Sequence, residues 1–187
     1  MTSQSSADLI DLLENQVENH VHDAVKTFQN LSVETLMKPS VQGGWSIAQC
    51  LWHLNSYGDY YLPKIAAGLA KNYPVSREFR STWFGDYFTR IMKPGAQMKK
   101  FKAFKNHVPP SDIDADKVVA TFIQQQELLL KYLTQARHTD MDRVRIPISI
   151  LKWVKLKLGD VFQFIIAHNE RHLQQAKRNL PGDLRWR

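Results

Sequence analysis

The chain has 187 residues, 43 % hydrophobic and 11 % aromatic, which suits one domain over residues 1–187 with a substantial core. We read no membrane span and no secretory signal, and the single cysteine, Cys50, excludes an internal disulfide, so a cytoplasmic protein is expected. The formal charge of +7 permits an anionic partner without identifying one.

A first amphipathic helix is predicted over residues 7–30. Its apolar residues recur with helical spacing, at Leu9, Leu13, Val17, Val21, Ala24 and Phe28. His20 borders this stripe and could face either the core or solvent, whereas His22 lies off the stripe and is expected to be solvated. Neither histidine is favoured as a metal ligand.

A second helix is predicted to begin after Ser46, because Ser46 and Gln49 have the spacing of a capping box. His53 lies on this helix, with Cys50, Tyr57 and Tyr61 at neighbouring positions on the same side. Two interpretations stay open for His53. It is either a half-buried histidine bonded to a tyrosine or a metal ligand with polar groups around it.

Periodicity weakens over residues 72–110, which form a long connection rich in aromatic residues, glycine, proline and lysine. One or two helical turns are expected within the piece FGDYFTRIM. Between Tyr87 and Ser111 the chain has no acidic residue but has six basic ones, Arg90, Lys93, Lys99, Lys100, Lys102 and Lys105. A solvated loop is favoured over contact with nucleic acid. An intermediate interpretation is that these lysines bind a small anionic substrate at the mouth of a pocket.

A third helix is predicted over residues 112–137, opened by a cap signature at Ser111 and Asp114. Residues 143–158 are β-branched and partly alternating, but Pro147 interrupts them. With no obvious partner strand, this segment is predicted to be an extended connection and not part of a sheet.

A fourth helix is predicted from Leu158 to a point before Pro181, and it carries His168 and His172. Four residues are about one turn, so both imidazoles leave the same side of the helix and could share one divalent metal ion. The alternative is a pair that faces solvent or is satisfied by hydrogen bonds. Glu170 points about 200° away from His168, so it is not assigned as a general base.

Four amphipathic helices without a series of strands predict an all-α protein, a four-helix bundle with a long aromatic and basic connection between helices two and three. Helices of a bundle can project ligands toward one another in its interior. His53 on the second helix, with His168 and His172 on the fourth, has the placement that such a site needs.

Two motifs resemble the DinB-like superfamily, which includes bacillithiol S-transferases and, more distantly, mycothiol-dependent maleylpyruvate isomerase. They are W-S-x-x-Q-x-x-x-H-L at residues 45–54 and L-G-D-x-F-x-F-x-x-x-H-N-E-R-H-L-Q-Q at residues 158–175. The resemblance implies a four-helix bundle with a divalent metal ion, such as zinc or nickel, held by three histidines. Carried over by position, these are His53, His168 and His172. A homodimer is a further expectation from the family.

The resemblance implies a metal-dependent thiol S-transferase or a related hydrolase that acts on a small molecule, with a low-molecular-weight thiol as a possible cofactor. No residue is assigned a catalytic role, and Tyr57 and Tyr61 are candidates for contact with the substrate. A non-catalytic metal-binding stress protein is the alternative, and a nucleic-acid-binding protein using residues 93–105 ranks third. The connection over residues 72–110 matches no subfamily, so it does not identify the substrate.

Overall fold

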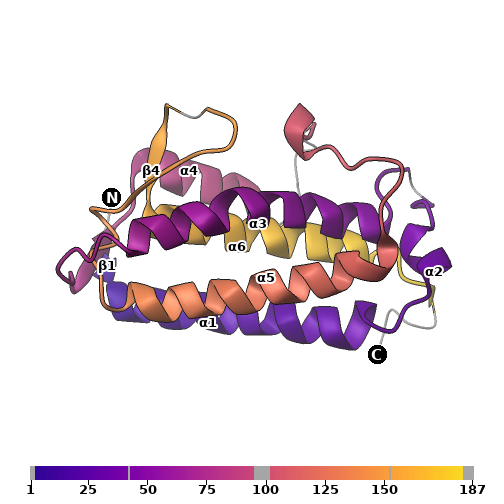
Figure 1. Cartoon of the computed structure of the whole chain (residues 1–187), viewed down its shortest axis with the longest axis horizontal. Helices are drawn as coiled ribbons and strands as arrows, with labels where there is room; N and C mark the ends of the chain where they lie inside the picture. The colour runs from indigo at the N-terminus through magenta and orange to yellow at the C-terminus, as the bar shows by residue number, and fades with distance from the viewer. Residues whose placement is uncertain (1–2, 42, 95–101, 152, 183–187) are drawn as a thin grey trace.

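Four long helices form the body of the molecule in a computed structural model that describes residues 3–41, 43–94, 102–151 and 153–182. They are α1 (Ser6–Asp23), α3 (Ile47–Leu69), α5 (Ala115–Ala136) and α6 (Leu158–Lys177). Helices α1 and α3 each pack against both α5 and α6, which makes a four-helix bundle (Figure 1). The predicted all-α class is therefore confirmed. Within the described ranges, no helix has the length and hydropathy needed to cross a membrane.

The start of α3 follows the predicted capping box. The hydroxyl of Ser46 accepts a hydrogen bond from the Gln49 amide (3.2 Å), and Gln49 Oε1 accepts one from the Ser46 amide (3.0 Å). The helix continues through Pro63 to its end at Leu69. The first helix, α1, continues at its C-terminal end into a π-helical turn, η1 (Ala24–Phe28). The two together span nearly the predicted range of residues 7–30.

Helix α5 begins later than predicted. Asp114 occupies its N-cap position and Ala115 is its first residue, so the cap signature at Ser111 does not open the helix. The side chain of Asp114 makes no capping hydrogen bond and instead accepts one from Lys117 Nζ at 2.7 Å. Local spacing alone was therefore insufficient to fix this boundary.

The prediction that residues 143–158 contain no sheet was wrong. Strand β3 (Arg145–Pro147) pairs antiparallel with β4 (Lys155–Lys157), with Ile146 opposite Leu156. The partner strand lies within the same segment, and each strand is only three residues long, too short to show clear alternation. Ile146 and Leu156 are both buried, so this small hairpin closes part of the hydrophobic core.

The connection between α3 and α5 is structured. Strand β2 (Glu78–Arg80) pairs with β1 (Ser3–Ser5), and α4 (Trp83–Met92) then packs along α6. A 3₁₀ turn, η2 (Lys105–His107), reaches the N-terminal half of α3. Since α3 and α5 both start at the end of the bundle beside α2 (Val33–Met37), the connection must return along the bundle (Figure 1). With ten residues, α4 is longer than the one or two turns expected.

Buried polar residues divide the core into two hydrophobic clusters. Members of the first cluster include Leu9, Ile65, Leu133 and Ile165, and members of the second include Phe28, Leu51, Phe122 and Leu173. Between the two clusters along the four long helices lie His20, His53, Gln126, His168 and Asn169, all buried. Buried polar groups need hydrogen-bond partners or ligands, so this polar layer is the part of the interior where a functional site is expected.

A buried carboxylate attaches α4 to the bundle. Asp160, at the start of α6, is fully buried and accepts hydrogen bonds from the Thr82 amide (3.2 Å) and the Thr82 hydroxyl (2.7 Å). The same hydroxyl accepts a bond from the Gly85 amide (2.9 Å) and so caps α4. A Cβ atom on Gly85 would lie 2.1 Å from Asp160 Cγ, so glycine is needed for this close approach.

Replacing Asp160 by alanine is expected to lower the free energy of unfolding by about 1–3 kcal/mol, because the donors of Thr82 lose their buried acceptor. Thermal unfolding followed by circular dichroism measures this change. The matched control is Glu127→Ala, which removes an exposed carboxylate from α5 and should change stability by less than about 0.5 kcal/mol. Equal effects of the two substitutions would contradict the anchoring role of Asp160.

Candidate metal centre

His53 is oriented by a backbone carbonyl from the connection. Its ring is buried on α3, and Nδ1 lies 2.6 Å from the carbonyl oxygen of His107. A carbonyl oxygen only accepts, so Nδ1 carries the proton and donates it. The other nitrogen, Nε2, therefore presents its lone pair to the interior, which is the form that binds a metal.

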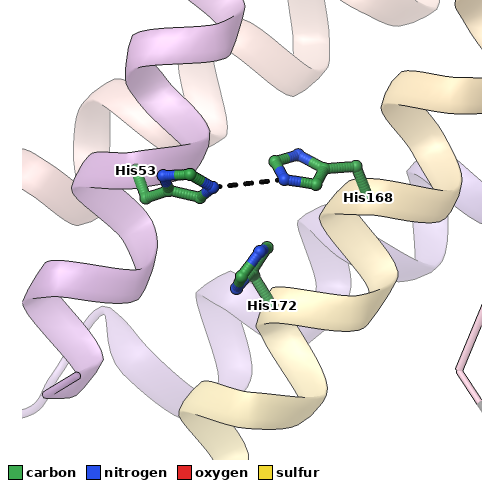
Figure 2. Close-up of side chains that lie close together, drawn as sticks. All are labelled: His53, His168 and His172. Carbon is green, nitrogen blue, oxygen red and sulfur yellow. Dashed lines mark hydrogen bonds between the residues drawn. The ribbon is translucent and has the colours of Figure 1, made fainter. Parts of the chain in front are cut away.

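His168 faces His53 across the space between α6 and α3. The Nε2 atoms of the two rings lie 3.2 Å apart, and both side chains are buried (Figure 2). Two nitrogens bound at 2.0–2.1 Å to one tetrahedral ion would lie about 3.3 Å apart, so this separation suits a shared ion. His168 Nδ1 is buried without a hydrogen-bond partner among the described residues, so hydrogen bonds alone leave this ring incompletely satisfied.

His172 completes the group from one turn further along α6. Its Nδ1 donates to Gln175 Oε1 at 2.9 Å, which leaves Nε2 as the nitrogen with a free lone pair. One ligand atom from each of His53, His168 and His172 lies within 4.8 Å of the other two. The three predicted residues are thus brought together, and the group could hold a metal ion.

Desolvation favours the neutral form of all three imidazoles, including the half-buried ring of His172. Desolvation lowers the pKa of His53 to about 4 and the pKa of His172 to about 3. Desolvation, followed by the neighbouring His172 and His53, lowers the pKa of His168 well below its ordinary value. A neutral imidazole is the form that ligates a metal, so the donor set needs no proton removed at neutral pH.

His107 is a site residue that the sequence analysis did not single out. Besides its carbonyl bond to His53, its ring stacks on Tyr57 with centroids 3.9 Å apart, and its Nδ1 lies 2.8 Å from Ser56 Oγ. Residues 72–110 show no periodicity that would reveal such a contact. The one available signal was that His107 is the sole histidine in this connection.

An open cavity of about 920 Å³ lies over the three histidines. Its walls include Trp45, whose ring centroid is 4.7 Å from that of His53, and Tyr57, whose ring centroid is 4.4 Å from that of His168. Tyr61 is not among the described residues that line it, and its hydroxyl accepts a hydrogen bond from the Ser149 amide at 3.1 Å. Tyr57 is thus at the cavity, and Tyr61 lies behind it.

The two histidines of α1, His20 and His22, lie apart from the group of His53, His168 and His172. His20 is buried and its Nε2 lies 3.0 Å from Glu170 Oε2, while His22 is exposed as predicted. The carboxylate of Glu170 is therefore a hydrogen-bond partner of His20 on α1.

Other polar residues near the motif have structural contacts. Asn169 donates to Gln126 Oε1 at 2.9 Å inside the bundle. Cys50 is buried, and desolvation raises the pKa of its thiol to about 12, which makes it an inert core residue. Of the basic connection, Lys102 lines the cavity, whereas Lys99 and Lys100 lie outside the described residues.

Comparison with known proteins gives one family match. A family model described as the DinB superfamily matches residues 16–176, a range that includes His53, His168 and His172. Searches of curated proteins and of solved structures found no match.

Untagged protein is expected to bind about one equivalent of a divalent metal ion at neutral pH. His53→Ala should abolish stoichiometric binding, because it removes one ligand and the ring that faces His168. Elemental analysis after gel filtration measures the bound metal. The matched control is His22→Ala, which removes an exposed histidine. Loss of metal from both variants, or from neither, would contradict the site.

Metal-free protein is expected to become less stable as the pH falls from about 6.5 to about 4. The unfolded chain takes up protons near the ordinary histidine pKa of 6.5, whereas the folded pKa of His53 is about 4. Acid therefore favours the unfolded state over this window. Urea unfolding at a series of pH values measures the change. A flat or rising unfolding midpoint on acidification would show that these rings are not held neutral.

Proposed function

We propose that this chain, which belongs to the DinB superfamily, is an enzyme that uses a divalent metal ion held by His53, His168 and His172. The proposed reaction is the transfer of a low-molecular-weight thiol to an electrophilic small molecule. One observation carries the proposal, namely that three neutral imidazoles converge beneath an open cavity. Imidazole donors suit zinc and nickel, which are the two candidate ions.

The protein groups around the site position the ligands and shape the space above them. A divalent ion bound there would lower the pKa of a thiol or a water molecule, so that the reactive anion forms near neutral pH. The His107 carbonyl fixes the ring of His53, and Gln175 fixes the ring of His172. The ring of Trp45 lies beside both rings, with its centroid 4.7 Å from that of His53 and 5.8 Å from that of His172.

Tyr57 is proposed to contact the substrate. Its ring lies between those of His107 and His168 at the cavity wall, and burial raises the pKa of its hydroxyl. The phenol therefore stays protonated and can donate a hydrogen bond. Contact of Tyr61 with the substrate stays a prediction, and its position behind Tyr57 makes it the weaker candidate of the two.

The open cavity favours catalysis over simple metal storage. Structural metal sites are closed by four protein ligands, whereas catalytic sites keep a position for water or substrate. Here three histidines form the group and about 920 Å³ of space lies above them. A hydrolase acting at the same site is the second candidate, because activation of water needs the same donors. A non-catalytic metal-binding stress protein is the third, and a homodimer stays a prediction.

Restoring zinc or nickel to metal-free protein is expected to switch on conjugation of a thiol to an electrophile. Monobromobimane with a panel of low-molecular-weight thiols gives a fluorescent readout, and a panel of esters tests hydrolysis. The rate with His53→Ala should fall at least about 100-fold, because the metal supplies most of the activation. His22→Ala should keep the full rate. Stoichiometric metal without turnover on either panel would instead support the non-catalytic protein.

A further inference from the structure

Cationic side chains from three parts of the chain line the cavity over the histidines. They are Lys38 after α2, Lys102 in the connection, and Arg171 and Arg178 on the last helix and its C-cap. Among the described lining residues there is no aspartate or glutamate. A concave site lined by one sign of charge concentrates its field inside the cavity, so anions are favoured there.

The two arginines have a fixed relation to the metal-binding face of α6. Arg171 lies three residues after His168 and directly precedes His172. Arg178 lies seven residues after Arg171. Seven residues are nearly two full turns, so both arginines leave the same side of the helix, about 10 Å apart along its axis. They therefore form one edge beside the histidine pair on a single rigid element.

Both arginines line the cavity over the histidines, and a hydrogen bond limits the movement of Arg171. Arg171 is half-buried and its Nη1 donates to the Ile91 carbonyl of α4 at 3.3 Å, which limits the positions open to its guanidinium. The charges of Arg171 and Arg178 both act electrostatically on the ring of His172. The charge of Arg178 also acts on Arg171, so the two cationic side chains lie within electrostatic range of each other.

We propose that the substrate of this site is a small molecule with a carboxylate or phosphate group, and that Arg171 and Arg178 bind this group while Lys38 and Lys102 add positive charge from other parts of the cavity lining. The guanidinium group suits both kinds of anion because its planar fork makes paired hydrogen bonds. The role of the anion as part of a substrate rests on the proposed function, but its binding does not require the metal. The concave placement of the cations favours a small molecule over a nucleic-acid duplex.

Calorimetric titration of metal-free protein with succinate and with inorganic phosphate, at low ionic strength, tests this anion site. Without metal, any binding must come from the protein itself, and the variants show whether the cationic side chains contribute to it. We expect one equivalent of at least one anion to bind, with an affinity that falls as salt is added. The double variant Lys102→Gln/Arg178→Gln should weaken binding roughly tenfold. It spares Arg171, whose bond to Ile91 supports α4. Stronger binding of succinate or of phosphate identifies the carboxylate or the phosphate class.

The matched control is Lys71→Gln, which removes one exposed positive charge just beyond the far end of α3 and should leave the affinity unchanged. Absence of binding by both anions, or equal binding by wild type and the double variant, would overturn the anion site even if metal-dependent turnover is found. Binding that is lost in the double variant supports the anion site even if no turnover is found. The two proposals can therefore fail separately.

Discussion

The core of this helical bundle must accommodate two buried imidazoles, His53 and His168, with the half-buried ring of His172 beside them. A histidine removed from water must be neutral and must have partners for both ring nitrogens. One nitrogen of His53 is satisfied by the His107 carbonyl, and one nitrogen of His172 by Gln175. One nitrogen from each of His53, His168 and His172 lies within 4.8 Å of the other two, so the group could hold a metal ion. The polar layer between the two hydrophobic clusters is thus organised around this point.

The topology of the bundle explains why a distant segment completes the site. Helices α3 and α5 start at the same end, so the chain between them has to travel the length of the bundle (Figure 1). On the way it is attached to α6 through Asp160 and Thr82, and it then delivers His107 against His53. A connection of this length would be an entropic cost if it were only a linker. Here it supplies a hydrogen-bond acceptor and part of the cavity wall.

Much of this architecture could be predicted from the sequence because it is encoded locally. The apolar period identified the four long helices, and Ser46 with Gln49 marked the start of α3 through bonds that span three residues. The spacing of His168 and His172 placed both rings on one side of α6. The convergence of His53 on them is a long-range contact, expected from bundle geometry and the family resemblance and not from spacing alone.

The features that were missed depend on contacts between distant or very short segments. The hairpin of β3 and β4 has three-residue strands, and only its pairing shows that Ile146 and Leu156 belong to the core. The start of α5 is set without the predicted cap bond at Ser111. The bond from His53 to His107 uses the backbone carbonyl of His107, a group that every residue has, so the side-chain pattern could not predict this contact.

X-ray absorption at the zinc edge, on untagged protein loaded with one equivalent of zinc, identifies the atoms that bind the ion. We expect nitrogen or oxygen atoms at about 2.0–2.1 Å from the zinc, together with the more distant scattering of three imidazoles. Sulfur bound at about 2.3 Å, or a spectrum without imidazole scattering, would contradict a site made of His53, His168 and His172.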